Sequence, residues 1–241
     1  MGCNCSSKVK PLSVLSYHKD TKEIPLKSQK RETKEYNYKI LLLGALGSGK
    51  STILKQIRKL YGDPITQNEY IAIKTHLSQN IIEIMRCLAV YSDILYDSGN
   101  ETNVDVTNIQ RRNNIAKMKD NKKLTEQDCN DFYALWCDNG IQNTLKHREN
   151  FQLICTYKYL VERINMIWRS DYIPNFNDYI HSQQRTTGVN RTNFTIERNE
   201  FVKENYSIFD FGGAKNERRK WIHFFQNTSV ILYVVSLIGY Y

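Results

Sequence analysis

Apolar residues recur along this chain in patterns that change twice, and each pattern predicts a different kind of element. Tyr38 to Leu43 ends in four consecutive aliphatic residues and predicts a strand. A helix-compatible stretch follows, which Gly62-Asp63-Pro64 stops near Tyr61. Beyond it the spacing is helical, and a long amphipathic helix is predicted by a stripe with alternating steps of four and three: Leu77, Ile81, Ile84, Leu88, Tyr91 and Leu95.

Shorter helices are expected in the rest of this block, which Tyr172-Ile173-Pro174 ends. They are Asp131 to Trp136, Ile141 to His147, and Phe151 to Trp168. The stretches Asp97 to Thr107 and Asn113 to Asp128 are polar and predict loops or short helices.

After this block the pattern becomes that of strands. Asn193 to Ile196 and Tyr206 to Phe209 are short strand candidates on either side of a charged stretch from Glu197 to Glu204. Glu217 to Phe225 suits an amphipathic helix with Trp221 and Phe225 on one face. Val230 to Leu237 is a continuous apolar run, typical of a buried parallel strand.

Together these elements predict an α/β fold in which a parallel sheet carries an all-helical insert. The sheet domain takes residues 37–64 and 178–241, and the helical insert domain takes residues 65–177. Residues 1–36 are expected to form a tail, in which Pro11 and Pro25 prevent one continuous helix.

The segment between the first strand and the first helix fits the phosphate-binding pattern G-x-x-x-x-G-K-[ST]. Its residues are Gly44, Ala45, Leu46, Gly47, Ser48, Gly49, Lys50, Ser51 and Thr52. In such a loop, glycines let backbone N–H groups turn toward the phosphates, and the helix N-terminus favours an anion. Lys50 would reach the β- and γ-phosphates, and the Ser51 hydroxyl would bind Mg²⁺. The alternative interpretation is an ordinary Gly/Ser-rich turn.

Composition and charge narrow the class of protein. The 241 residues are 41% hydrophobic, enough for a globular core, and no apolar stretch is long enough to span a bilayer. The six cysteines show no C-x-x-C pair, so free thiols in the cytosol are expected. The net charge of +9 is spread along the chain and mixed with acidic residues, and no nucleic-acid-binding motif accompanies it. We therefore expect no nucleic-acid partner.

The N-terminus carries a pattern for lipid attachment. Met1-Gly2-Cys3-Asn4-Cys5-Ser6 fits the signal for N-myristoylation at Gly2, with Cys3 beside it as a palmitoylation candidate. Two acyl chains, or one chain with a basic patch, attach a protein stably to the inner leaflet. We therefore expect a lipid-anchored protein on the cytoplasmic face of the plasma membrane. The alternative is an ordinary tail that begins Met-Gly.

In these motifs the chain resembles the α subunits of heterotrimeric G proteins over most of its length. The pieces that carry the resemblance occur in family order: Met1-Gly2-Cys3, Leu41 to Thr52, Leu135-Trp136, Gly140-Ile141-Gln142, Tyr172-Ile173-Pro174, Arg185-Thr186-Thr187-Gly188, Asp210-Phe211-Gly212-Gly213, and Glu217 to His223. The resemblance implies a P-loop, Ras-like GTPase domain with a helical insert, which binds GTP or GDP with Mg²⁺ and transduces signals from G protein-coupled receptors.

The resemblance also implies roles for single residues. Thr186 matches the switch I threonine on Mg²⁺, Asp210 the carboxylate near the metal, and Gly213, next to Gly212, the switch II glycine that senses the γ-phosphate. Lys220 and Trp221 look like the switch II residues that the family presents to the βγ dimer.

Three departures from the family pattern predict impaired hydrolysis. The family's transition-state arginine aligns with Gln183, and its water-orienting glutamine aligns with Ala214. Leu46 replaces a loop glycine where a bulky side chain crowds the γ-phosphate and the attacking water. Arg185 stays among the candidate nucleotide contacts, although it matches the family's lysine. An arginine of this kind is worth about 10³ to 10⁵ in rate, a magnitude for which Gα proteins are themselves an example.

The C-terminus is expected to leave the sheet domain incomplete. The family continues for about another hundred residues, a domain-sized extension that carries the base-reading N-K-x-D motif and the receptor-binding helix. Receptor coupling is therefore not expected, and guanine is not distinguished from adenine by these residues. Cys155-Thr156, where the family tends to have Asp-Ser, removes further nucleotide contacts.

Two functions and a third possibility remain open from the sequence. The first function is a Gα-like, nucleotide-binding signal transducer with negligible hydrolysis. The second is a non-enzymatic scaffold or competitor that binds the βγ dimer. The third possibility is a decayed gene product without a stable fold.

Overall fold

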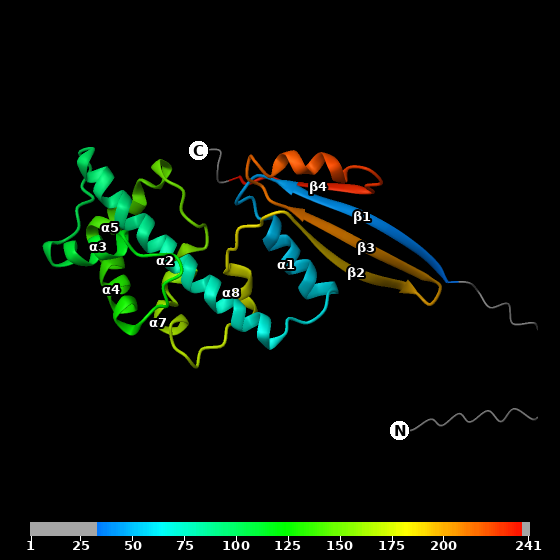
Figure 1. The fold of residues 1–241 in the computed structure, drawn as a ribbon, viewed down its shortest axis with the longest axis horizontal. Helices are drawn as coiled ribbons and strands as arrows, with labels where there is room; N and C mark the ends of the chain where they lie inside the picture. The colour runs from blue at the N-terminus through cyan, green and yellow to red at the C-terminus, as the bar shows by residue number, and fades with distance from the viewer. Residues whose placement is uncertain (1–32, 238–241) are drawn as a thin grey trace, which may run out of the picture. The chain divides into compact units, whose positions relative to one another are not determined.

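The computed structural model describes residues 33–237, and within it one mixed sheet of four strands carries the phosphate loop. The strands follow the order β2-β3-β1-β4, with β1 parallel to β3 and β4, and β2 antiparallel to β3 (Figure 1). Their bounds are β1 Lys34–Gly44, β2 Val189–Asn199, β3 Val202–Phe211 and β4 Val230–Val234. The α/β class with a mostly parallel sheet is thus confirmed, with one antiparallel strand at its edge.

Strands β2 and β3 form one long hairpin rather than two short strands separated by a charged loop. The charged stretch lies mostly within the strands, where Glu197 pairs with Lys203 at 3.0 Å and Arg198 with Glu204 at 2.8 Å. Opposite charges across neighbouring strands stabilise a sheet, so charge at these positions did not mark a loop.

The segment from α1 to β2 is helical, and α2 is the longest of its helices. Their bounds are α1 Lys50–Tyr61, α2 Gln67–Asp97, η1 Val106–Asn108, α3 Ile109–Ala116, α4 Glu126–Trp136, α5 Asn139–Lys146, η2 Arg148–Asn150, α6 Tyr157–Val161, α7 Ile164–Ile167 and α8 Phe176–His181. Helix α2 begins with a capping box, in which Thr66 accepts from the Glu69 N–H and the Glu69 carboxylate accepts from the Thr66 N–H. The cap holds the first turn of α2 next to α1, where Arg58 pairs with Glu69 at 2.7 Å.

The predicted stripe of α2 forms the centre of the main core, which confirms the period. Leu77, Ile81, Ile84 and Leu88 are fully buried, and Leu95 is nearly so. Helices α3, α5, α6, α7 and α8 pack against α2.

The single helix predicted from Phe151 to Trp168 is wrong, because the chain breaks it into α6 and α7 after an irregular stretch. Tyr157, Leu160, Ile164 and Ile167 are nevertheless all buried in the core. Their steps of three and four correspond to one face of a helix, so the helical spacing of the buried positions continues across the break. The following helix α8 was not predicted.

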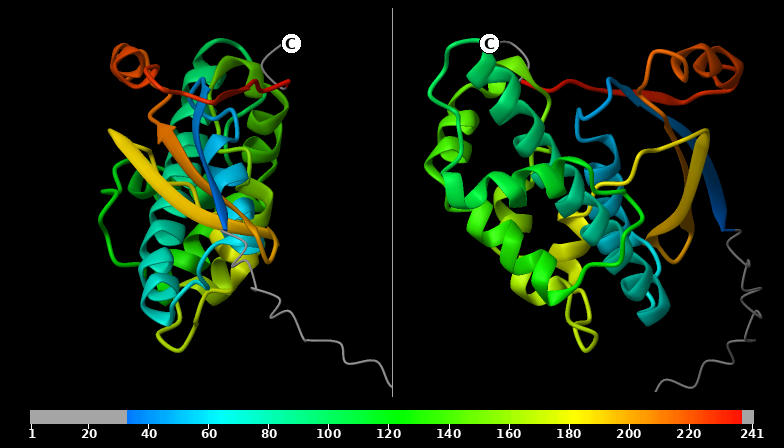
Figure 2. Two further views of the ribbon diagram at one scale, coloured as in Figure 1. Left: turned by 90° about the vertical axis from the view of Figure 1, so that its right-hand side faces the viewer. Right: turned by 60° about the vertical axis from the view of Figure 1, so that its left-hand side comes forward.

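The sheet presents a different layer on each face. Leu41, Leu43 and Phe211 form a small core with Trp221 and Phe224 of η3 (Arg218–Phe224). Figure 2 shows η3 on one face of the sheet and α1 on the other. The prediction that Phe225 shares this face with Trp221 is wrong, because η3 is a 3₁₀ helix and side chains three apart align on it. Phe225 is instead exposed.

Strand β4 is parallel to β1, as predicted, but it is not buried. Leu232 is 40% exposed and Tyr233 is 60% exposed, because no described element covers the outer edge of β4. An apolar run predicts a strand through its composition, whereas burial depends on what packs against it.

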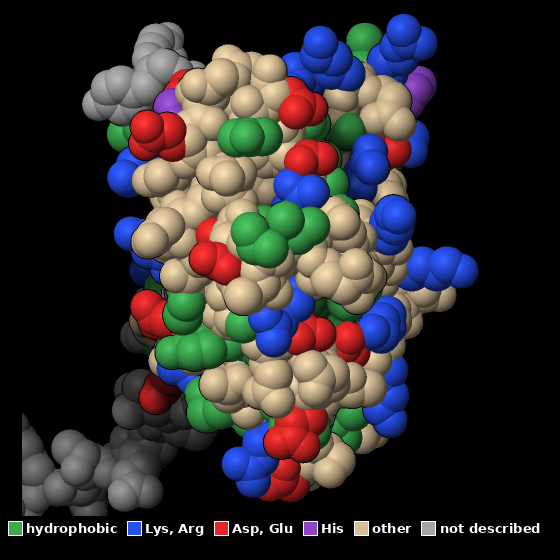
Figure 3. Space-filling view, turned by 90° about the vertical axis from the view of Figure 1, so that its left-hand side faces the viewer, with side chains coloured by type: hydrophobic (Ala, Val, Ile, Leu, Met, Phe, Trp, Pro, Cys, Tyr) green, Lys and Arg blue, Asp and Glu red, His purple; other side chains and the backbone are tan. Residues whose placement is uncertain are grey.

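The charges on the surface are mixed in sign. Figure 3 shows acidic and basic side chains interspersed over one face of the molecule. The four cysteines within residues 33–237 are free thiols. Among the described residues, no helix is long and apolar enough to cross a membrane.

Candidate functional site

The loop between β1 and α1 takes a conformation that requires its glycines. Gly47 and Gly49 have φ of 73° and 97°, in the left-handed region that residues with a Cβ avoid. A Cβ on Gly44 would stand 2.3 Å from the Val234 carbonyl oxygen of β4. The loop is therefore open at its tip and tightly held at its base.

Lys50, the first residue of α1, turns back into this loop. Its side chain is 5% exposed, and Nζ donates to the carbonyl oxygens of Gly44 at 3.0 Å and Ala45 at 2.8 Å. Burial lowers the pKa of Lys50, the nearby Asp210 carboxylate opposes that shift, and the Arg218 guanidinium adds to it. The ammonium is thus held at the place where the motif puts the phosphates.

Three oxygen-bearing side chains from distant segments meet next to the loop. The Ser51 hydroxyl donates to Asp210 Oδ2 at 3.1 Å and lies 3.2 Å from the Thr186 hydroxyl. Asp210 is 1% exposed, and its Oδ1 has no hydrogen-bond partner within residues 33–237. Burial raises the pKa of Asp210, against the Ser51 hydrogen bond and the Lys50 charge.

A buried carboxylate oxygen without a partner costs free energy unless a cation or donor satisfies it. Hydroxyl and carboxylate oxygens are the ligand types that Mg²⁺ takes alongside water and phosphate. The oxygen groups of Ser51, Thr186 and Asp210 are therefore of the types that fit a magnesium ion. The part of the chain that the structure describes contains no group of three or more His, Cys, Asp or Glu residues that could hold a metal by themselves.

The turn after β3 closes against the loop. A Cβ on Gly213 would stand 2.6 Å from the backbone of Ala45 and Leu46, and a Cβ on Gly212 would stand 2.7 Å from the Thr186 carbonyl oxygen. Both glycines are buried. Any larger residue here would separate the turn from the loop.

The carboxylate of Glu217 ties the turn to the segment before β2. It accepts from the backbone N–H of Gly188 at 3.1 Å and from Lys220 Nζ at 2.8 Å. The structure thus brings together three candidate segments: residues 44–52, 185–188 and 210–213.

Four other candidates near the loop have exposed side chains. Gln183 and Arg185 are exposed, and Thr52 is exposed in the first turn of α1. Leu46 is 55% exposed at the tip of the loop. Within residues 33–237, neither Gln183 nor Arg185 makes a side-chain hydrogen bond.

Asn80 of α2 holds the backbone of Gln183 and was missed from the sequence. Its Nδ2 donates to the Gln183 carbonyl at 2.8 Å, and its Oδ1 accepts from the Gln183 N–H at 2.7 Å. Asn80 is 5% exposed. A polar residue inside the apolar stripe of α2 was the available signal, because buried amides are normally hydrogen-bonded.

Lys55 of α1 was also missed, and it joins α1 to α8. Its Nζ donates to the carbonyl oxygens of Tyr179 and Ser182 at 2.7 and 2.5 Å. Burial lowers the pKa of Lys55 to about 8. The two carbonyls belong to the C-terminal end of α8, which attracts cations.

Lys220 and Trp221, which the resemblance matches to residues that contact the βγ dimer, lie on η3. Trp221 Nε1 donates to the Gly212 carbonyl at 3.4 Å, so the indole links η3 to the buried turn. Lys220 is exposed and paired with Glu217, and Ile222 is 70% exposed. The lipidation candidates Gly2 and Cys3 lie outside the described residues.

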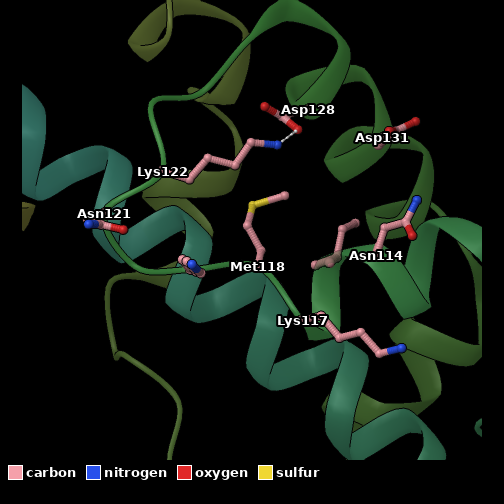
Figure 4. A pocket seen from close by; sticks show the side chains of 9 residues that line it. Asn114, Lys117, Met118, Asn121, Lys122, Asp128 and Asp131 are labelled. Atoms are coloured by element: carbon pink, nitrogen blue, oxygen red, sulfur yellow. Dashed lines mark hydrogen bonds and ion pairs between the residues drawn. The ribbon is translucent and has the colours of Figure 1, made fainter.

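A separate hollow of about 520 Å³ lies between α3 and α4, away from the loop (Figure 4). Its carboxylates are already neutralised: Asp128 binds Lys122 at 2.5 Å, and Asp131 binds Arg111 at 3.0 Å. None of the predicted site residues lines it.

A strand, a glycine loop with a buried lysine, a helix, and an adjacent serine, threonine and aspartate are the features of a P-loop protein. Comparison with known proteins identifies the family within this class. The family model of the G-protein alpha subunit matches residues 17–241. The chain therefore belongs to the G-protein α-subunit family.

Individual relatives agree with this assignment. The chain is 31% identical to the guanine nucleotide-binding protein alpha-2 subunit of Neurospora crassa, over 88% of this chain and 58% of that protein. It is 34% identical to a guanine nucleotide-binding protein subunit alpha of Emericella nidulans, over 84% of this chain and 56% of that protein. The G(o) subunit alpha of Lymnaea stagnalis is 28% identical over the whole chain and 65% of its own length. The chain thus spans somewhat more than half the length of these relatives.

Proposed function

We propose that this protein binds a guanine nucleoside triphosphate or diphosphate at the loop around Lys50, as a Gα-like signal transducer. The observation that carries the proposal is the meeting of Ser51, Thr186 and Asp210 beside the loop, with one buried Asp210 oxygen that has no hydrogen-bond partner among the described residues. In this proposal Ser51 and Thr186 hold Mg²⁺, which neutralises phosphate charge. The remaining contacts are Gly44, Gly47, Ser48, Gly49 and Thr52 on the loop, with Arg185, Gly212 and Gly213 opposite. The sheet domain of residues 37–64 and 178–241 supplies them, and residues 65–177 form the helical domain.

Hydrolysis is proposed to be negligible. An exposed Gln183 supplies no positive charge, Ala214 cannot hydrogen-bond an attacking water, and Leu46 occupies the tip of the loop. Loss of the arginine alone corresponds to roughly 4 to 7 kcal/mol of barrier. A single-turnover assay with bound GTP measures this directly, and hydrolysis at the rate of an ordinary Gα would refute it.

Nucleotide binding is tested by titrating the purified chain with fluorescent GTP, GDP and ATP in Mg²⁺. The matched control is Lys50→Ala, which removes the buried ammonium from the loop. We expect GTP and GDP to bind the wild type at least about tenfold more tightly than the variant, since a charge-assisted phosphate contact is lost. Equal signals from wild type and variant would eliminate the proposal.

A second candidate function is a scaffold that binds the βγ dimer without nucleotide. It is supported by η3, on which Lys220 and Ile222 are exposed and Trp221 is half-buried. Pull-down of βγ by the wild type, and its loss in Trp221→Ala, would support this function. Nucleotide-independent capture would favour the scaffold over the switch.

We further propose that the protein is held at the cytoplasmic face of the plasma membrane by acyl chains on Gly2 and Cys3. The sequence motif supports this, together with the two-signal rule for stable anchoring. Gly2→Ala should release the protein from the membrane fraction of expressing cells. Unchanged fractionation of that variant would contradict the anchor.

A further inference from the structure

Strand β4 forms one edge of the sheet, and no described strand lies beyond it (Figure 1). The Ser229 N–H donates to the Lys39 carbonyl at 2.9 Å, toward β1. Backbone groups of successive residues in a strand point to opposite sides, so Val230 and Leu232 direct their N–H and C=O groups away from β1. The outer edge of β4 therefore offers main-chain donors and acceptors to another strand.

The side chains of β4 are exposed on both faces of the sheet. Tyr233 pairs with Leu43 on the face that carries η3, and it is 60% exposed. Leu232 is 40% exposed on the opposite face. From Val230 to Leu237 the sequence contains no charged residue, no proline and no glycine. Strand β4 thus lacks the features that usually prevent the edge of a sheet from pairing with another chain.

The opposite edge of the same sheet, strand β2, has those features. It carries Arg191, Glu197 and Arg198, and its register with β3 shifts between Glu197 and Asn199. Charges and bulges on an edge strand oppose the addition of another strand. The two edges therefore differ in kind, because β2 ends the sheet and β4 leaves it open to extension.

The composition of β4 fits a second copy of this chain as the partner. When two copies of one strand pair antiparallel about a two-fold axis, the residue on the axis faces its own copy. A charged residue there would meet its own like charge, which destabilises the pair. Val230 to Val234 brings only aliphatic and aromatic side chains to the axis. Pairing of β4 with β2 of another copy would instead meet the charges and the bulge, so a closed dimer is favoured over an open chain of copies.

We infer that two copies of this chain associate through β4, with the two strands antiparallel and Leu232 on the two-fold axis. Leu232 is the central residue of β4 and directs its backbone groups outward, so the two copies of Leu232 exchange both main-chain hydrogen bonds. The two sheets then join into one sheet of eight strands, four from each copy. The inference is independent of the proposed nucleotide site.

The test measures the mass of the purified, unacylated chain by size-exclusion chromatography with light scattering, over a series of concentrations. We expect the mass to rise with concentration to twice the 28.4 kDa of one chain. Leu232→Lys and Leu232→Glu should each weaken the dimer at least about tenfold, because like charges then face each other and an apolar contact is lost. An equimolar mixture of these two variants should recover the dimer, since lysine then faces glutamate.

The matched control is Thr195→Lys, which adds the same charge at an exposed position of the other edge strand, β2. It should dimerise as the wild type does. Thermal unfolding checks that each variant folds. If the charged variants unfold, Leu232→Pro takes their place, because it removes an outward N–H and leaves the pairing of β4 with β1 in place.

Hydrogen exchange locates the contact. The backbone amides of Val230 to Val234 should exchange more slowly as the wild type dimerises, and the Leu232→Lys variant should lack this protection. A wild type that stays monomeric, or whose mass grows beyond that of a dimer, would overturn the inference. A dimer that persists in Leu232→Lys would also overturn it, and a mixture that fails to recover the dimer would overturn the register about Leu232. Protection of these amides in a monomer would mean that another segment of the same chain covers the edge, which equally contradicts the dimer.

Discussion

The amide of Asn80 is the contact whose removal tests most directly how the helical part of the chain positions the nucleotide site. Asn80→Ala deletes both hydrogen bonds to the Gln183 backbone, at 2.8 and 2.7 Å, and leaves the rest of α2 unchanged. Gln183 begins the segment that delivers Thr186 to Ser51. The substitution should therefore loosen that segment rather than unfold the core.

The expected magnitude follows from the two bonds. Each contributes about 0.5–1.5 kcal/mol net, so Asn80→Ala should lower the free energy of unfolding by about 1–3 kcal/mol. For a chain of this size, that corresponds to a fall of about 2–12 °C in Tm. Asn80→Asp should cost more than alanine, because a carboxylate oxygen would replace the donor that faces the Gln183 carbonyl, and two acceptors would then oppose each other.

Calorimetry measures the loss of stability, and limited trypsin digestion measures the loosening of the segment that begins at Gln183. Arg185 is exposed in the loosened segment, so cleavage after Arg185 should be faster in Asn80→Ala, as identified by mass spectrometry. The matched control is Asn68→Ala, at an exposed position on the same helix. If Asn80→Ala matched that control in both Tm and cleavage rate, the amide would not hold this segment, and the reasoning would be refuted.

Three further predictions concern stability and the loop. The hydrogen bonds from Arg58 and from the Thr66 N–H lower the pKa of Glu69 to about 2 from 4.5, so its contribution is fully present above pH 4.5 and is lost as the pH falls through 2. Because the Glu69 side chain is 41% exposed, solvent screening reduces this contribution to the free energy of unfolding to about 1 kcal/mol. In urea unfolding, the free energy of unfolding of Glu69→Gln should approach that of the wild type as the pH drops from 6 to 3. A difference between the two that stays constant with pH would contradict this. Gly213→Ala should abolish nucleotide binding while the circular dichroism of the helices is unchanged, because its Cβ would stand 2.6 Å from the loop backbone; full affinity would disprove the close approach. Leu88→Ala in the centre of α2 should cost about 2–5 kcal/mol by chemical denaturation, and a loss below about 1 kcal/mol would mean that the site is not close-packed.

Some errors of the sequence-based prediction have a common cause. The pattern of apolar residues predicts that Phe151 to Trp168 is helical and that Val230 to Leu237 is a strand, and both stretches do contain such elements. The pattern does not show that the helix breaks between Val161 and Ile164, or that β4 lies at an open edge. Local periodicity reports the type of an element, whereas its breaks and its burial depend on its neighbours.

What the sequence by itself determined is what depends on short-range geometry. The spacing of Gly44, Gly49, Lys50 and Ser51 predicts the phosphate loop, in which Gly47 and Gly49 take left-handed φ angles, and the 3.6-residue period predicts α2, because both are patterns of nearby residues. Without the family resemblance, no local pattern linked Ser51 to Asp210, which lie 159 residues apart, or suggested that Asn80 holds Gln183. Those contacts were decided by the tertiary structure, because only the parallel pairing of β1 with β3, and the packing of α2 beside the sheet segment, bring such distant side chains within hydrogen-bond distance.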